Sequence, residues 1–346
     1  MFFASDNTGP MHPAVAQAMI AADTGYLPSY GTDPIMDGVR AQIREIFEVP
    51  DAAVYLVATG TAANALALAT MAEPWDAVFC TPLAHINVDE CHAPEFYTGG
   101  AKLSLVGTGD KMTSDQLRTR IEGWGKGDVH TSQRGPVQLT QVTEMGRLYT
   151  LDELRALTGV ARDYGLPTFM DGARFANALV ALGCTPAEMT WKAGINALSF
   201  GGTKNGCAGV EAVIFFDPSK AWEFELRRKR GAHLFSKHRY LSAQMQGYLA
   251  DGVWLDAARA ANANAARLAE GLRDMPGLDF VEERAANMIF ATLPRREHQR
   301  LKAGGAVYGL WGDLEGDPEE RIMMRLVCDW SITHEMIDDF LALAKG

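Results

Sequence analysis

Ser199-Phe200-Gly201-Gly202-Thr203-Lys204-Asn205-Gly206 is the stretch of this sequence that decides its predicted fold. Apolar residues precede it at 195–198 and follow it at 210–216, a pattern that predicts a glycine-rich turn between two buried strands. The lysine at the tip of this turn is unusual, because lysine is almost never buried unless something pairs with it. A desolvated lysine has a lowered amine pKa and is the residue type that forms Schiff bases with carbonyl groups.

Two other interpretations of this turn are open on the motif alone. The first is a surface loop with a solvated lysine. The second is a phosphate-binding Walker loop, but Asn205 follows Lys204 where that motif has Ser or Thr, and no glycine directly precedes the lysine. The sequence therefore disfavours the Walker loop and leaves a solvated loop as the alternative to a reactive lysine.

A second motif, Phe169-Met170-Asp171-Gly172-Ala173-Arg174, lies upstream, after a short strand that starts at Pro167. An acid at the carboxyl end of one buried strand, followed by a lysine at the end of another, suits pyridoxal 5'-phosphate (PLP). The aspartate keeps the pyridine nitrogen protonated, and the lysine holds the aldehyde. Each motif is weak alone, but the two in this order predict that cofactor.

The stretch Ala53–Val57 predicts a strand, which runs through a turn into an alanine-leucine helix that ends near Met71. The turn contains Gly60, Thr61 and Ala62, with Thr61 near the helix N-cap. The free backbone N–H groups at the start of such a helix point back at the turn and make an anion site. We expect the cofactor phosphate there, and an ordinary capped helix is the alternative.

His85 follows another expected strand, at 77–80, in a short apolar context. A histidine beside apolar residues is more often part of the core than of a catalytic site. Because His85 comes just past a strand end, on the side where open α/β sheets hold their sites, its imidazole is a candidate to stack on a flat ring.

The chain has 346 residues, a formal net charge of −11 and five cysteines. The length predicts one large domain and a smaller one. Acidic charge repels phosphate backbones, so nucleic acid is not an expected partner. We find no apolar run of 18 or more residues and no signal sequence, so a membrane is not an expected partner either. The scattered, odd-numbered cysteines are typical of free thiols in a reducing cytoplasm, and no metal-ligand spacing is present.

Strand and helix patterns alternate from residue 53 to residue 216, which predicts an α/β fold with a mostly parallel sheet covered on both faces. From residue 277 onward, short strands (279–282, 288–293, 322–328) alternate with helices (295–303, 334–344) and predict a compact α+β domain. We expect an amino-terminal arm and helix, a large cofactor-binding domain and a small carboxyl-terminal domain, at 1–30, 31–238 and 239–346.

Seven motifs, in order along the chain, carry a resemblance to a known family: Ser5-Asp6-Asn7-Thr8, Tyr30-Gly31-Thr32-Asp33, Gly60-Thr61-Ala62-Ala63-Asn64, Ala84-His85-Ile86, Asp171-Gly172-Ala173-Arg174, Ser199 to Gly206, and Arg325-Leu326-Val327-Cys328. The chain resembles the L-threonine aldolases, fold-type-I PLP enzymes that include low-specificity threonine aldolase and phenylserine aldolase. The lysine and aspartate motifs are the most specific parts of the resemblance. It implies the aspartate aminotransferase-like fold.

The resemblance also implies a role for each matched residue. Lys204 would form the Schiff base with PLP, Asp171 would pair with the pyridine nitrogen, and His85 would stack on the ring. The residues implied for the phosphate are Gly60, Thr61 and Ala62, with Arg228 or Arg230 of a second subunit. The residues implied for the substrate are Ser5, Arg174 and Arg325 at its carboxylate, and Tyr30 from the neighbouring subunit. Arg174 would also lie near the cofactor hydroxyl.

The chain departs from the family pattern at one loop. Where many members have Glu-Asn-Thr-His, this chain has Gln141-Val142-Thr143-Glu144, so no role for that loop is carried over. His130 matches a second active-site histidine near the substrate hydroxyl in some members, although its spacing to Thr143 differs by one residue. His85 or His130, directly or through water, is the expected base for the substrate's β-hydroxyl proton.

The implied activity is retro-aldol cleavage of L-threonine, L-allo-threonine or a related β-hydroxy-α-amino acid, such as phenylserine, to glycine and an aldehyde. The implied assembly is a homodimer or homotetramer with active sites at the dimer interface. Two alternatives stay open. One is another fold-type-I PLP enzyme, a β-eliminating lyase or an aminotransferase, and the other is a non-catalytic phospho-ligand-binding protein on the same scaffold.

Overall fold

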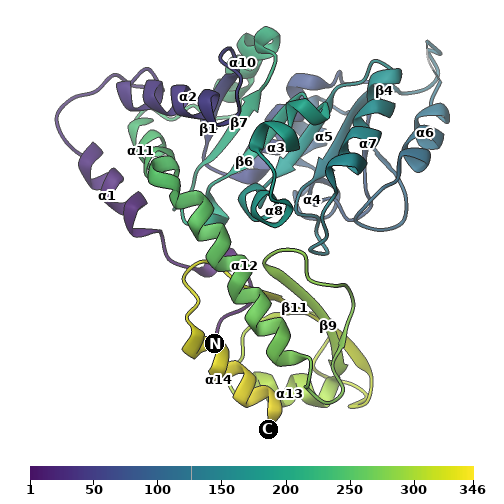
Figure 1. The fold of residues 1–346 in the computed structure, drawn as a ribbon. Helices are drawn as coiled ribbons and strands as arrows, with labels where there is room; N and C mark the ends of the chain where they lie inside the picture. Colours follow the sequence, from purple (N-terminus) through teal and green to yellow (C-terminus); the bar gives the residue numbers. More distant parts are fainter. Residues whose placement is uncertain (126) are drawn as a thin grey trace.

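A computed structural model describes residues 1–125 and 127–346 of the chain. Its centre is a seven-stranded sheet with the strand order β1-β7-β6-β5-β4-β2-β3 (Figure 1). The strands are β1 (Ala53–Val57), β2 (Asp76–Cys80), β3 (Lys102–Leu105), β4 (Gln133–Thr140), β5 (Thr168–Gly172), β6 (Ala197–Gly201) and β7 (Glu211–Phe215). Neighbours from β6 to β3 are parallel, and β7 runs antiparallel to β1 and β6. The predicted mostly parallel sheet is confirmed.

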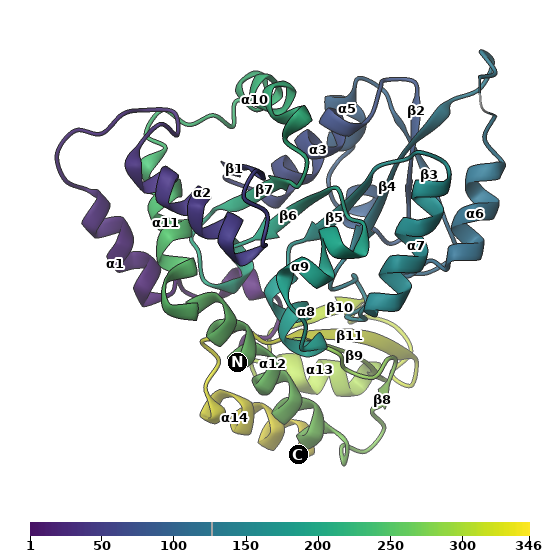
Figure 2. The same cartoon turned by 45° about the horizontal axis from the view of Figure 1, so that its top comes forward.

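Helices cover both faces of this sheet (Figure 2). They are α1 (Pro13–Ala22), α2 (Pro34–Ile46), α3 (Gly60–Met71), α4 (His85–Val88), α5 (Ala93–Thr98), α6 (Ser114–Glu122), α7 (Leu151–Asp163), α8 (Phe175–Leu182), α9 (Pro186–Met189), α10 (Ala221–Arg230) and α11 (Arg239–Leu249). Along β1, Val54 and Leu56 belong to an apolar cluster with α2, α7 and α8, whereas Tyr55 and Val57 belong to another with α3 and α10. Successive strand residues point to opposite faces, so each face has its own core.

A smaller domain follows along the chain and lies in the lower part of Figure 1. Its antiparallel sheet has the order β10-β11-β9-β8. Its elements are β8 (Asp279–Phe280), β9 (Met288–Pro294), α13 (Arg295–Ala303), β10 (Gly309–Trp311), β11 (Arg321–Val327) and α14 (His334–Lys345). The predicted α+β pattern is confirmed, although the sequence did not indicate the short edge strand β10.

The long helix α12 (Val253–Leu272) connects the two parts. Its first half contributes Trp254 and Ala258 to the core of the large sheet, and its second half contributes Leu268 and Leu272 to the core of the smaller domain. Because α12 contributes to both cores, the domain boundary expected between residues 238 and 239 stays a prediction. Among the described residues, no helix has both the length and the apolar character needed to cross a bilayer.

The amino-terminal arm packs on the small domain, whose residues lie at the other end of the sequence. The N–H of Phe3 donates to the carbonyl of Val307 at 2.7 Å, and the N–H of Val327 donates to the carbonyl of Phe3 at 2.8 Å. The Phe3 ring lies 5.1 Å from that of Phe340 on α14. In Figures 1 and 2 the amino terminus accordingly lies beside α14.

Glycine is required where β5 and β6 approach each other at their carboxyl ends. A Cβ added to Gly172 would lie 2.5 Å from the carbonyl oxygen of Ser199, and one added to Gly201 would lie 2.5 Å from that of Ala173. Real Cβ atoms do not come so close to backbone atoms, so a side chain at either position would push the two strands apart.

This close approach predicts that Gly172→Ala destabilises the protein by about 1–3 kcal/mol, the usual cost of overpacking. Urea unfolding measures the change. Gly38→Ala is the matched control, because Gly38 lies in α2 with no atom within 4 Å of an added Cβ. That control should be about 1 kcal/mol more stable than the wild type, since Ala favours a helix over Gly by that amount. Unchanged stability of Gly172→Ala would contradict the close approach.

Candidate active site

A cavity of about 390 Å³ opens at the carboxyl edge of the large sheet, where β4, β5 and β6 end. The predicted site residues that line it are Ser5, His85, Asp171, Arg174, Lys204 and Arg325. They come from the amino-terminal arm, from the segments that follow β2, β5 and β6, from the end of β5 itself, and from β11 of the small domain. The fold thus brings together six side chains that span 320 positions of the sequence.

Lys204 lies in a single turn of 3-10 helix (Thr203–Asn205) directly after β6. A hydrogen bond to β7 holds the start of this turn, because the N–H of Gly202 donates to Glu211 Oε2 at 2.9 Å. The charge of Arg174, and then burial, lowers the pKa of the Lys204 ammonium. Among the described residues, no hydrogen-bond or ion-pair partner holds its Nζ. A buried amine with a lowered pKa is the form of lysine that attacks carbonyl carbon.

Asp171 ends β5 opposite Ser199 on β6 and is held by a buried polar network. Asn64 Nδ2 donates to Asp171 Oδ2 at 2.9 Å and to Glu90 Oε1 at 2.8 Å. The Asn64 amide oxygen accepts from Ser199 Oγ at 3.0 Å, so its orientation is fixed. The carboxylate therefore has a fixed direction at the strand end.

His85 is the first residue of α4, just past the end of β2. Its Nδ1 lies 2.8 Å from Glu90 Oε1, and its Nε2 lies 3.4 Å from Asp89 Oδ2. The hydrogen bond with Glu90 raises the pKa of His85, although burial opposes it. His85 and Asp171 therefore share one network through Glu90 and Asn64, which fixes the imidazole beside the aspartate.

The two arginines predicted to bind a carboxylate are present at the cavity. Arg174 donates through Nε and Nη2 to the two carboxylate oxygens of Asp6, at 2.7 and 2.9 Å. Asp6 also accepts from Asn287 Nδ2 of the small domain at 3.1 Å. Arg325 donates to the carbonyl of Ala4 at 3.1 Å. The arm therefore carries the partners that orient both guanidinium groups.

Gly60, Thr61 and Ala62 form the first turn of α3, with Thr59 rather than Thr61 as the N-cap. The N–H groups of Gly60 and Thr61 have no helical partner, as in any first turn. A Cβ added to Gly60 would meet no atom within 4 Å, so there is open space beside the helix end. These residues do not line the cavity themselves, but Asn64, in the next turn of the helix, binds Asp171.

The arginines proposed for the phosphate lie at the end of α10. Arg228 is buried in its own chain, where it donates to the carbonyl of Leu56 at 3.2 Å and its guanidinium lies 5.1 Å from the ring centre of Tyr55. Arg228 therefore points inward in its own chain, and its role at the phosphate of a second subunit stays a prediction. Arg230 is exposed and stays a prediction.

Two other predicted residues lie away from the cavity of their own chain. Tyr30 is 45% exposed, and the ammonium of Lys229 lies 4.9 Å from its ring centre. Its role in a neighbouring site stays a prediction. His130 lies in an exposed loop before β4, whose carboxyl end, not its amino end, faces the cavity. Within one chain His130 therefore lies outside the cavity, and its role as a base stays a prediction.

Besides Glu90, three other buried carboxyls at the site were not identified from the sequence. Asp6 is the partner of Arg174, Glu211 supports the lysine turn, and Glu144 lines the cavity. Burial raises the pKa of Glu211 to about 7, and burial followed by the charge of Asp171 raises the pKa of Glu144 to about 7. Each lies within or beside a quoted motif, but only the fold shows that they are buried.

These residues fit PLP. An amine on one strand end and a fixed carboxylate on the next match the aldehyde and the pyridine nitrogen of the cofactor. An imidazole lies in the same network as that carboxylate, and a helix amino terminus with open space beside it suits a phosphate. The donor set thus provides a partner for each functional part of the molecule.

The buried pair of Asp6 and Arg174 predicts a loss of stability in Asp6→Asn. The side chains are 1% and 11% exposed, and removing one charge from a buried pair costs on the order of 3 kcal/mol. Burial alone would raise the pKa of Asp6, but Arg174 outweighs it and holds the pKa below the ordinary 3.8. The pair therefore stabilises the protein above about pH 4, and this contribution disappears as the pH falls through the lowered pKa.

Urea unfolding of wild type and Asp6→Asn at pH 7, 5 and 3 measures both effects. The difference between the two proteins should shrink toward pH 3. Asp152→Asn is the control, because Asp152 pairs with Arg155 at the surface and such pairs contribute about 1 kcal/mol or less. A constant difference across this pH range would contradict the role of the Asp6 charge.

Comparisons with known proteins agree with this geometry. Residues 3–294 match the family described as Beta-eliminating lyase. A low specificity L-threonine aldolase of Pseudomonas aeruginosa is 40% identical over 337 residues, 97% of this chain and 94% of that protein. One from a Pseudomonas species is 40% identical over 341 residues, 98% of this chain and 96% of that protein.

Solved structures extend the comparison to the fold. The threonine aldolase of Leishmania major superposes with a TM-score of 0.91 at 25% identity, covering 99% of this chain and 98% of that one. The serine palmitoyltransferase of Sphingomonas wittichii superposes with a TM-score of 0.74 at 17% identity, covering 100% and 86%, and shares the fold alone. With its lysine and aspartate on neighbouring strand ends and its match along most of the sequence, this chain belongs to the beta-eliminating lyase family.

Proposed function

We propose that this protein is a PLP-dependent aldolase that cleaves L-threonine, L-allo-threonine and related β-hydroxy-α-amino acids to glycine and an aldehyde. The observation that carries the proposal is the placement of Lys204 and Asp171 on adjacent strand ends, in a cavity that also contains two arginines. The 40% identity to low specificity L-threonine aldolases over nearly the whole chain supports the same activity.

PLP, when bound, supplies an electron sink for the bond that breaks at the substrate's Cα. Lys204 would hold the cofactor through its amine. Asp171, oriented by Asn64, would keep a proton on the pyridine nitrogen, and His85, oriented by Glu90, would cover the ring. These three side chains would hold the ring at the edge of the sheet.

The arginines decide which bond of the substrate breaks. Arg325 and the N–H groups of Arg174 that do not bind Asp6 would bind the substrate carboxylate, with Ser5 beside them. Two charge-assisted contacts of this kind fix both the position and the rotation of a carboxylate. Once the carboxylate is fixed, the Cα–Cβ bond is held in the orientation in which its electrons are withdrawn most easily.

The cavity has an apolar part that suits a range of β-substituents. Leu83, Val88, Met145 and Trp311 line it together with the charged groups. An apolar pocket discriminates weakly between β-substituents of different size, since one extra or missing methylene changes the free energy of discrimination by only about 1–3 kcal/mol. This lining supports cleavage of phenylserine as well as threonine.

The proposal extends to assembly and location. Tyr30 and Arg230 lie on the surface of their own chain, which supports a homodimer or homotetramer in which they complete a neighbour's site. All five cysteines are free thiols, which supports a reducing cytoplasm.

A second candidate follows from the family description, which names β-elimination. An eliminating lyase on this scaffold would convert a β-substituted amino acid to a keto acid and ammonia. Product analysis separates the two activities. Incubation with threonine, allo-threonine and phenylserine should release glycine and the matching aldehyde, and a keto acid as the main product would favour elimination.

Lys204 gives the most direct test of the proposed cofactor chemistry. Borohydride treatment of the wild type with PLP should leave the cofactor covalently attached to the peptide that contains Lys204, as measured by mass spectrometry. Lys204→Ala should lose both this adduct and turnover, because no other lysine lines the cavity among the described residues. Lys192→Ala, an exposed lysine paired with Glu48, is the control and should keep both. A label on another peptide would contradict the assignment.

A further inference from the structure

Glu144 lies in a tight turn directly after β4 and lines the cavity. Its Oε1 accepts a hydrogen bond from the backbone N–H of His85 at 2.8 Å. Its Oε2 is buried and has no hydrogen-bond partner among the described residues. A buried carboxyl oxygen without a partner costs free energy unless another molecule satisfies it, so the structure points to a ligand group at this atom.

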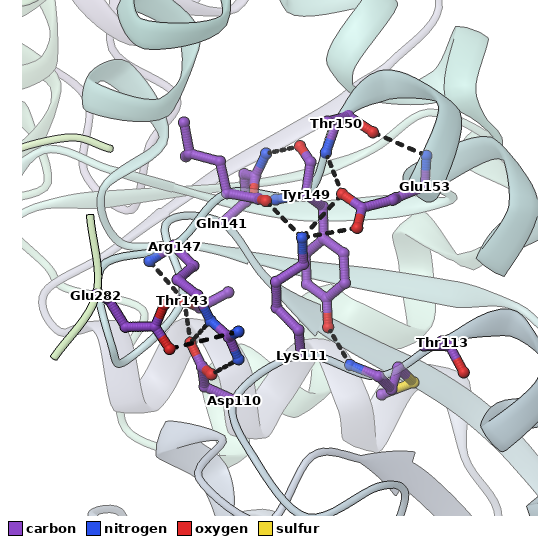
Figure 3. A network of polar contacts seen from close by, with 12 residues as sticks. Asp110, Lys111, Thr113, Gln141, Thr143, Arg147, Tyr149, Thr150, Glu153 and Glu282 are labelled. Atoms are coloured by element: carbon purple, nitrogen blue, oxygen red, sulfur yellow. Dashed lines mark hydrogen bonds and ion pairs between the residues drawn. The ribbon is translucent and has the colours of Figure 1, made fainter. Parts of the chain in front are cut away.

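The turn that carries Glu144 is held firmly (Figure 3). The N–H of Thr143 donates to the carbonyl of Arg147 at 3.0 Å, and the Thr143 hydroxyl donates to the carboxylate of Asp110. Arg147 also donates to Asp110, and it lies 3.6 Å from Glu282 of the small domain. Glu144 is therefore presented to the cavity from a backbone that two parts of the protein fix in place.

We propose that Glu144 is the base that removes the β-hydroxyl proton of the substrate. As the O–H bond breaks, the proton passes to Glu144 and the freed oxygen pair becomes the second bond of the aldehyde carbonyl. The Cα–Cβ bond breaks at the same time, and its electron pair stays on the Cα side. A proton returned to Cα completes glycine, so the overall cleavage neither consumes nor releases a proton.

The histidines fit this role less well. Both ring nitrogens of His85 face carboxylates, with Nδ1 2.8 Å from Glu90 and Nε2 3.4 Å from Asp89, an arrangement that favours the doubly protonated ring. An imidazolium has no free nitrogen to accept a proton. His130 lies outside the cavity of its own chain. Glu144 thus replaces the expected histidine as the base.

The surroundings of Glu144 suit proton transfer near neutral pH. The titratable groups close enough for their charges to interact with that of Glu144 are Asp171 at the end of β5, His85 on α4, Arg174 after β5, Cys80 on β2 and Tyr149 beyond the turn. Burial, and then the charge of Asp171, raises the pKa of Glu144 to about 7. A general base works best when its pKa lies near the working pH, because it is then both available and basic enough.

This inference rests on the proposed aldolase activity, and Glu144→Gln separates the two. Gln keeps an oxygen for the N–H of His85 but cannot take a proton. We expect kcat for threonine cleavage to fall by about 10²-fold or more, the range for loss of a general base. Exchange of the glycine α-proton with D₂O, which involves no β-hydroxyl, should stay within about twofold of the wild type.

The pH dependence gives a second measurement. Wild-type kcat should rise as the pH increases through about 7, because the carboxylate is the active form, and Glu144→Gln should lack this rise. Infrared difference spectra of the protein without cofactor should show carboxylic acid absorption from Glu144 and Glu211 that titrates in the same range, and Glu144→Gln should lose the Glu144 contribution while keeping that of Glu211. Glu153→Gln is the matched control, because Glu153 is exposed and a glutamine there can still accept the hydrogen bond from the N–H of Thr150. This variant should keep the kcat, the pH profile and the infrared band of the wild type.

The outcomes are distinct. Glu144→Gln with wild-type kcat and an unchanged pH profile would overturn the assignment of the base while leaving the aldolase intact. If wild type releases no glycine from threonine, the proposed function itself fails. If Glu144→Gln binds PLP poorly, Glu144→Asp provides the test, because it keeps a carboxyl group. A rise of kcat with pH in Glu144→Asp supports the proposal. Loss of this rise with kcat retained overturns it.

Discussion

The ion pair between Asp6 and Arg174 is the interaction on which the site depends. Arg174 follows β5, so its charge lies beside Lys204, where it is the largest cause of the lowered pKa of the lysine. A buried guanidinium is stable there only with a fixed counter-charge, which the amino-terminal arm supplies through two hydrogen bonds to Asp6. The same pair thus keeps Arg174 buried, tunes the lysine and attaches the arm to the sheet.

Much of this arrangement could be predicted from the sequence, because the relevant signals are local. An apolar strand followed by a glycine-rich turn places Lys204 at a strand end, and the same logic places Asp171. Parallel strands bring their carboxyl ends to one edge, so both residues are expected at that edge, and the pairing of β5 with β6 makes them neighbours. The motif Gly60-Thr61-Ala62 likewise predicted the helix start, because free N–H groups follow from helix geometry.

The sequence gives less guidance where a role depends on burial or on contacts between distant segments. The basic run at the end of α10 gives no sign that Arg228 turns inward to β1 while Arg230 stays exposed. His130 matched a family position, but its loop precedes β4 instead of following it. The sequence around Glu144 gives no sign of its role. In the fold its carboxyl lies at the cavity, where Asp171 and His85 affect its pKa.

The packing of Phe3 against Val307, Val327 and Phe340 has a consequence for how the protein is made. Phe3 leaves the ribosome well before its partners on β11 and α14. The large sheet can form during synthesis, since domains fold as units while the chain grows. The corner of the cavity around Ser5 and Arg325 has to wait until β11 has been made, so a nascent chain can acquire its sheet long before this corner is complete.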